Sequence, residues 1–305
     1  MVLQQEIPLL FPQGGTVDVD EGIVAQVSPE EQDICGGFLS RPILAHDHHR
    51  GGTVHNALNL LPGIRQKAVI ETVIDQVKGR VPVYAGTGCI STTDAIYMSK
   101  RAEQMGADVL SIITPSFALA SQKELYDHHV AVAKHVNIPI VLYNIPARTG
   151  NKLLPETVQA LCRDVDVIMG AKDSSGDLEN LKAYIRLTQE LPKKVAILAG
   201  NDGNILNCLK AGGIAGRANL YPATVASIYD KFVAGDIEGA EAAQQSITGI
   251  QRAMKLGNPN TVIKLATRML GNPVGEPRRP FNYLCPEGLE VLKEVLAEDA
   301  KLGLH

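Results

Sequence analysis

The sequence predicts a (β/α)8 barrel, the TIM-barrel fold of the α/β class, followed by a C-terminal helical extension. Short apolar runs alternate with amphipathic stretches of helical period, which is typical of βα units that build a parallel sheet. The apolar runs lack polar alternation, as strands covered on both faces do. The length of 305 residues suits a barrel of ~250 residues with added helices.

The elements follow in order from about residue 64. Strands are predicted at 81–85, 109–114, 138–144, 167–171, 195–199 and, more weakly, 214–220. The helices between them are predicted at 64–78, 92–105, 121–135, 155–163, 177–190 and 202–211. Two more strands in the first 60 residues would complete the eight. No Gly-x-Gly-x-x-Gly motif opens a helix after the first strand, which argues against a Rossmann-like sheet.

Beyond Pro222 the strand pattern stops. Helical patterns cover 222–234, 237–256, 259–270 and 286–302. We therefore divide the chain into a barrel, residues 1–222, and a C-terminal helical region, residues 223–305. No low-complexity linker separates them, so we expect the helical region to pack on the barrel.

Composition excludes several classes of function. The net charge of −4 and the pI near 6.1 offer no basic face for nucleic acid or anionic lipid. No apolar run approaches the ~18 residues of a membrane span. The N-terminus lacks a signal-peptide pattern, and the five cysteines are scattered without a Cys-x-x-Cys pair. These features favour a cytoplasmic protein with reduced thiols.

Lys172 is the strongest candidate for a catalytic residue. It stands at the end of an apolar strand, where the reactive side chains of βα barrels lie. Burial there disfavours the ammonium and leaves a free amine, which imine formation with a ketone requires. The alternative is a lysine that reaches out of the barrel mouth into solvent.

Tyr143 closes the preceding strand, so its phenol and the Lys172 amine could meet at the barrel mouth. A tyrosine there can relay protons for imine formation and for carbon–carbon cleavage, although a core aromatic fits the position too. Arg148 follows in the next loop, where its guanidinium could bind a substrate carboxylate or could simply be solvated. Gly86 and Asn201 lie in turns after two other strands, where the backbone can approach a ligand or make a tight turn.

A competing constellation lies upstream. His46 and His48 follow an apolar run, with His49 and His55 nearby, and two histidines one residue apart suit zinc. This arrangement resembles metal-dependent amidohydrolase barrels. The further ligands are missing, because His128, His129 and His135 fall within a predicted helix rather than at strand ends. We expect no metal site.

Three motifs together resemble the dihydrodipicolinate synthase/N-acetylneuraminate lyase family. They are YNIPARTG (143–150), GAKDSSGD (170–177) and GTGCISTTDAI (86–96). The resemblance covers about residues 65–305. It implies a barrel with a C-terminal helical region, no cofactor, and usually a homotetramer. It also implies pyruvate chemistry through an imine on Lys172, with Tyr143 as the proton relay and Arg148 on the second substrate.

The chain departs from this family in two places. Residues 24–64 fit poorly, and the threonines that bind the pyruvate carboxylate in the family reduce to Thr53 at best. Where the synthases carry paired tyrosines after Thr114-Pro115, this chain has Ser116 and Phe117. The candidate substrate-binding residues are therefore Arg148, Thr53, Gly86 and Asn201.

The sequence leads to a Schiff-base lyase or aldolase that joins or splits pyruvate and an aldehyde. The missing tyrosine and threonine argue against a synthase of the lysine pathway, and the Lys-Asp-Ser-Ser-Gly form resembles the sugar-acid aldolases of the same family. This resemblance implies a 2-keto-3-deoxy sugar acid as the substrate. The alternative within the family is 4-hydroxy-tetrahydrodipicolinate synthase, which uses aspartate semialdehyde. The alternatives from other classes are the metal-dependent amidohydrolase and a non-catalytic paralogue that binds keto acids.

Overall fold

Five parallel strands form the centre of the molecule. The computed structural model describes residues 15–19, 23–27, 62–208, 213–272 and 274–304. The parallel strands are β3 (Val83–Gly86), β4 (Val109–Ile113), β5 (Ile140–Asn144), β6 (Ile168–Asp173) and β7 (Ala196–Ala199), which pair in chain order. They confirm five strands of the predicted alternation.

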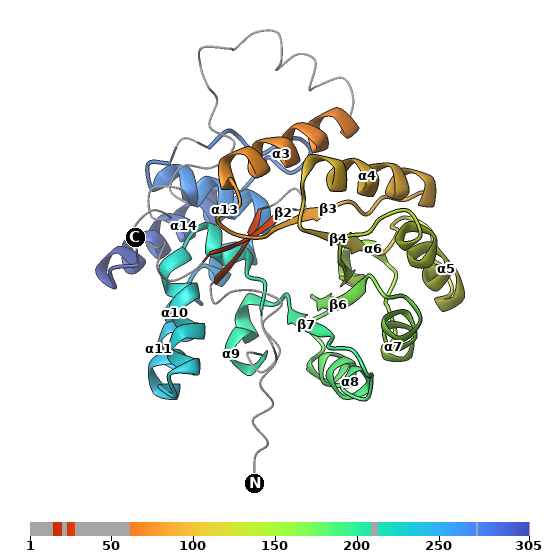
Figure 1. The fold of residues 1–305 in the computed structure, drawn as a ribbon. Helices are drawn as coiled ribbons and strands as arrows, with labels where there is room; N and C mark the ends of the chain where they lie inside the picture. Colours follow the sequence, from red (N-terminus) through yellow and green to blue (C-terminus); the bar gives the residue numbers. More distant parts are fainter. Residues whose placement is uncertain (1–14, 20–22, 28–61, 209–212, 273, 305) are drawn as a thin grey trace.

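Helices link these strands and lie outside them. They are α3 (Pro62–Val77), α4 (Thr92–Met105), α5 (Gln122–Ala133), α7 (Pro155–Asp164) and α8 (Leu178–Thr188). A short helix that the sequence did not predict, α6 (Pro146–Thr149), lies in the loop after β5. Figure 1 shows the five longer helices in an arc around the strands, which is the arrangement of a βα barrel.

The first strands differ from the prediction. β1 (Gly15–Val19) and β2 (Ile23–Val27) pair antiparallel, and β2 pairs antiparallel with β3. We expected parallel strands in the first 60 residues. With three residues between them, the two strands have no room for the helical crossover that parallel neighbours need.

The weak strand predicted at 214–220 is also wrong. Among the described residues this segment forms isolated bridges rather than a strand: Gly213 bridges to Ala199 of β7, Ala215 is a further bridge residue, and the chain then forms the 3-10 helix η4 (Gly216–Asn219). The backbone amides of Gly216 and Arg217 donate to the Asp202 carboxylate at 3.0 and 2.9 Å. Because these amides are taken, they cannot form a strand ladder. Asp202 itself begins the turn η3 (Asp202–Asn204), which leads into α9 (Ile205–Cys208).

The C-terminal region is helical, as predicted. It contains α10 (Pro222–Val233), α11 (Ile237–Ser246), α12 (Gln251–Met254), α13 (Pro259–Met269) and α14 (Pro286–Lys301). The predicted helix 237–256 is interrupted between α11 and α12. Two poor helix formers, Thr248 and Gly249, lie at the break, and the Ile247 carbonyl accepts a hydrogen bond from Arg217 instead of continuing the helix.

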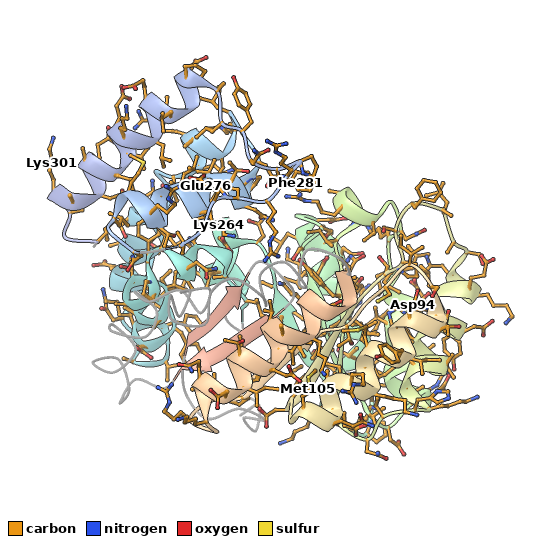
Figure 2. The ribbon with its side chains drawn as sticks, turned by 90° about the horizontal axis from the view of Figure 1, so that it is seen from above. Asp94, Met105, Lys264, Glu276, Phe281 and Lys301 are labelled. Atoms are coloured by element: carbon orange, nitrogen blue, oxygen red, sulfur yellow. The ribbon has the colours of Figure 1, made fainter. Side chains whose placement is uncertain are left out.

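Two apolar clusters hold these parts together. One fills the space between the outer faces of β3–β7 and the surrounding helices. The other joins α10–α14 to Ile205, Ala215 and Ala218, which lie near the end of β7 and in η4. In Figure 2, Asp94 marks the start of α4 and Met105 marks its end. The start of α4 is the end that faces the C-terminal region, where Phe281 and Glu276 are labelled. With the contact of α13 to η4, this places the C-terminal region on the side where the strands end.

Candidate active site

Lys172 and Tyr143 meet at the carboxyl ends of β6 and β5. The two residues are partners in the parallel ladder, and the Lys172 Nζ atom lies 4.3 Å from the centre of the Tyr143 ring. Only 3% of the Lys172 surface is exposed, whereas Tyr143 is half-buried. The structure therefore brings together the two residues that the sequence proposes as the amine and the proton relay.

The pairing follows from strand alternation. Ala171 packs in the outer cluster, and so does Leu142 of β5, so the next residue of each strand faces the barrel interior. Leu198, the ladder partner of Lys172 on β7, belongs to the inner cluster. The other members of that cluster are Tyr84, Val109, Val141 and Ile214.

The inner cluster is apolar apart from the phenol of Tyr84. Burial raises the pKa of the Tyr84 phenol far above its ordinary value, and the nearby Asp108 charge adds to the effect. An amine at the top of such a cluster has an apolar floor beneath it. The mouth of the barrel, where the active sites of βα barrels lie, is therefore the expected route for polar ligands to Lys172.

Gly200 makes room for the lysine. A Cβ atom at this position would lie 2.8 Å from Lys172 Cε and 1.9 Å from Ser174 Oγ. The Gly200 amide donates to the Asp173 carbonyl at 2.8 Å, and its carbonyl accepts from Ser174 Oγ at 3.2 Å. The turn after β7 is therefore held against the end of β6, at a distance that only glycine permits.

The loop that carries Arg148 is anchored at its base. Thr149 accepts a hydrogen bond from Thr114 at 2.9 Å. The buried Asn151 donates to the carbonyls of Pro115 and Ala118 and accepts from the Ala120 amide, each at 2.8 Å. The Arg148 side chain is exposed and makes no hydrogen bond or ion pair with any residue that the structure describes. The loop is thus held at its base by hydrogen bonds, while the guanidinium of Arg148 is exposed to solvent.

The remaining predicted substrate-binding residues have other contacts or are not described. The Gly86 carbonyl accepts a hydrogen bond from Gln66 Nε2 at 2.7 Å. Asn201 is exposed, and its side chain accepts from the Gly203 amide at 3.0 Å, which caps η3. Thr53 lies outside the described residues. The roles of Gly86, Asn201 and Thr53 stay predictions.

The structure does not test the proposed histidine site, because His46, His48, His49 and His55 lie outside the described residues. Within the described part of the chain, no group of three or more His, Cys, Asp or Glu side chains could hold a metal ion. His128 and His129 lie in α5, as predicted, and the structure shows that both are buried. None of the described helices is long and apolar enough to cross a membrane.

Sequence reasoning missed two polar residues beside the lysine. Asn144 and Asp173 are buried one position after Tyr143 and Lys172, and their side chains are hydrogen-bonded to each other at 2.9 Å. The signal was present, because both motifs place a polar residue at the last position of an apolar strand. Such residues are easily read as turn or cap residues.

Comparisons with known proteins agree with this geometry. Residues 60–299 match the dihydrodipicolinate synthetase family. The chain is 35% identical over 250 residues to a 4-hydroxy-tetrahydrodipicolinate synthase of Thermoanaerobacter sp. (strain X514), covering 81% of this chain and 83% of that protein. It is 32% identical over 285 residues to the synthase of Caldicellulosiruptor bescii, covering 90% and 95%.

The fold has solved counterparts as well. The crystal structure of dihydrodipicolinate synthase from Aquifex aeolicus superposes with a TM-score of 0.78 at 25% identity, over 96% of this chain and 99% of that one. The dihydrodipicolinate synthases of known structure that this chain resembles are TIM barrels, so the predicted (β/α)8 fold class is confirmed.

Proposed function

Because the chain belongs to the dihydrodipicolinate synthetase family, whose members are pyruvate-condensing Schiff-base enzymes, we propose that it is a 4-hydroxy-tetrahydrodipicolinate synthase. In this proposal the enzyme joins pyruvate to aspartate semialdehyde through Lys172. The observation that carries it is the buried amine of Lys172 on the ring of Tyr143, at the carboxyl end of β6.

The proposed chemistry follows from this pair. The neutral Lys172 amine attacks the keto carbon of pyruvate, and the oxygen leaves as water when the C=N bond forms. Loss of a methyl proton then gives an enamine, whose carbon attacks the aldehyde. Tyr143 carries protons between these groups and solvent. No metal or cofactor takes part in this sequence of steps.

The sugar-acid reading favoured by the sequence is the weaker one. The relatives described above are named as synthases, which supports the alternative. Ser116 and Phe117 still stand where the synthases have tyrosines, and this keeps a sugar-acid aldolase as the second candidate. We also propose a cytoplasmic homotetramer, which the family resemblance and the scattered cysteines support.

Arg148 distinguishes the two candidates. Its exposed guanidinium can hold a carboxylate of the second substrate through a bidentate, charge-assisted contact. We predict that Arg148→Ala raises KM for aspartate semialdehyde roughly 10- to 100-fold, which corresponds to about 1.5–3 kcal/mol. Trapping of pyruvate should remain nearly unchanged, because that half of the reaction lies at Lys172.

The measurement is steady-state kinetics with aspartate semialdehyde and with a neutral aldehyde. Lys152→Ala, which removes another partly exposed cation near the carboxyl ends of the strands, is the matched control. If both aldehydes lose the same factor, or if pyruvate trapping also falls, Arg148 supports the site generally and the assignment is wrong.

The central test of the proposal is chemical. Incubation with pyruvate and borohydride should add one reduced pyruvate group, located on Lys172 by peptide mass spectrometry. Lys172→Ala should not be labelled and should lose several orders of magnitude in kcat. Lys193→Ala, which removes another lysine with a partly buried amine, should be labelled as the wild type is.

The other functional classes predict different outcomes. A metal-dependent hydrolase would not be labelled and would lose activity after treatment with a chelator. A non-catalytic paralogue would bind pyruvate without turnover. Labelling of a lysine other than Lys172 would refute the proposed mechanism.

A further inference from the structure

Asn144 and Asp173 form a buried polar pair directly behind the candidate catalytic pair. They are ladder partners on β5 and β6, one position beyond Tyr143 and Lys172. Because side chains alternate along a strand, they lie on the outer face of the sheet while Tyr143 and Lys172 face the interior. Asn144 Nδ2 donates to Asp173 Oδ1 at 2.9 Å.

The Asp173 carboxylate is fully supplied with donors. Oδ1 also accepts from the Ser175 amide at 3.0 Å, and Oδ2 accepts from Ser175 Oγ at 3.1 Å and from Asn180 Nδ2 at 2.9 Å. A buried carboxylate is tolerated only when such bonds replace its water. Of these four bonds, only the one from Asn144 comes from the neighbouring strand.

The orientation of the Asn144 amide is fixed. Its Oδ1 atom accepts from the Leu153 amide at 3.0 Å, so its NH2 group must face Asp173. Leu153 follows the loop that carries Arg148, so this bond also returns that loop to the end of β5. The side chain therefore links β6, β5 and the Arg148 loop at one point.

This link lies where the two strands end. The last backbone bond between them runs from the Ser174 amide to the Asn144 carbonyl at 2.8 Å. Without the side-chain bond between Asn144 and Asp173, the last residue pair of the β5–β6 ladder would be held by this backbone bond alone. A change in its geometry would move Tyr143 and Lys172, which stand on the adjacent rung.

We propose that Asn144 and Asp173 are positioning residues that hold Tyr143 against Lys172 for proton transfer. The proposal rests on the proposed Schiff-base function. The attacking amine belongs to Lys172 itself, so the final yield of imine should survive loss of the pair, although slower proton relay would delay its formation. The step that needs the tyrosine should slow, because a displacement of about 1 Å can cost about 100-fold in rate.

The experiment measures two steps with pyruvate alone. Borohydride trapping reports the imine, and exchange of the pyruvate methyl protons in D2O reports the proton transfer that converts imine to enamine. We expect Asn144→Ala to lower the exchange rate roughly 10- to 100-fold, while the yield of trapped imine stays within about twofold of wild type.

Asn180→Ala is the matched control. It removes a donor to the same carboxylate from α8 and leaves the contact between β5 and β6 in place. It should lower the melting temperature as Asn144→Ala does, but should leave the ratio of exchange to trapping near the wild-type value. If the two variants lower this ratio equally, the pair has only a structural role and the proposal is wrong.

Exchange of donor and acceptor gives an independent test. Asn144→Asp alone sets two carboxylates face to face. Asp173→Asn alone can keep an oxygen towards Asn144 only by turning its NH2 group towards the Asn180 side chain, which is also a donor. The double variant restores one donor and one acceptor across the rung, although the Ser175 amide loses its partner. The double variant should exchange pyruvate protons faster than Asn144→Asp alone, and a rate no better than that of Asn144→Asp would overturn the proposal.

The wild-type arm separates this inference from the proposed function. If the wild-type enzyme traps no pyruvate on Lys172, the Schiff-base function itself is wrong, and the positioning role fails with it. If trapping is normal and the ratio does not respond to Asn144, the function stands and only the positioning role is refuted.

Discussion

At the scale of single residues, Lys172 and Tyr143 of the candidate site differ in how far they are buried. Lys172 is almost completely buried, whereas Tyr143, its ladder partner on β5, is half-buried. A buried amine can form an imine, but protons must still reach it and leave it. In the proposed mechanism the tyrosine carries them, and the contact of its ring with the Lys172 nitrogen supports this role.

We predict that Tyr143→Phe lowers kcat by roughly 10²–10⁴-fold. The substitution keeps the ring that packs on Lys172 and removes only the hydroxyl, so the fold and the trapped imine should persist. Turnover, circular dichroism and borohydride trapping would be measured together. Tyr126→Phe, which removes an exposed hydroxyl bonded to Asp164, is the control. A near-normal kcat would make Tyr143 a packing residue.

At the scale of elements, the sequence predicts what depends on local pattern. The apolar runs place β3–β7 correctly, and strand alternation is enough to set Lys172 beside Tyr143. Asn144 and Asp173 are visible in the sequence as polar residues at strand ends, but the bond between their side chains could not be predicted, because it depends on the register of the two strands and on the orientation of the Asn144 amide. The turn at 216–219 escaped prediction because Asp202, distant in sequence, takes its amides.

Helix α5 carries a pair of buried histidines that makes stability depend on pH. Burial, with a smaller contribution from the neighbouring His129, lowers the pKa of His128 to about 4. The His128 Nδ1 atom is hydrogen-bonded to Thr92 Oγ1 at 2.9 Å, and its ring meets that of His129 edge-on at 5.1 Å. Burial also lowers the pKa of His129. Both rings are therefore neutral in the folded protein.

The sign of the pH dependence follows. In the unfolded chain these histidines have a pKa near 6.5, so below that pH the unfolded state binds protons that the folded state does not. Their contribution to stability is present above about pH 6.5 and is lost as the pH falls toward 4. For His128 the loss amounts to roughly 2–3 kcal/mol.

We predict that His128→Gln loses less stability than the wild type between pH 7 and pH 4.5. Chemical denaturation at the two pH values measures the difference, and the carboxylates common to both proteins cancel. His135→Gln, at an exposed histidine just beyond α5, should behave as the wild type does. An identical pH response in His128→Gln would show that this histidine does not titrate on unfolding.

At the scale of the whole molecule, the loop after β4 exposes two large apolar side chains to solvent. Phe117 and Leu119 are 97% and 83% exposed. Phe117 adopts a φ of +81°, a left-handed conformation that costs a side-chain-bearing residue about 1–2 kcal/mol. Asn151 holds this loop through its bonds to Pro115, Ala118 and Ala120. A strained, fully exposed ring on a rigid loop is a feature that a contact with another copy of the chain would bury.

We therefore predict that the proposed homotetramer depends on Phe117. Phe117→Glu should shift the protein to smaller species in analytical ultracentrifugation, because a carboxylate cannot be buried in an apolar contact without a partner. Phe117→Gly separates strain from contact: it removes the left-handed penalty, so it should weaken assembly without destabilising the subunit. Tyr283→Glu changes an exposed aromatic residue of the C-terminal region and is the control. Wild-type assembly in both Phe117 variants would exclude this loop from the subunit contacts.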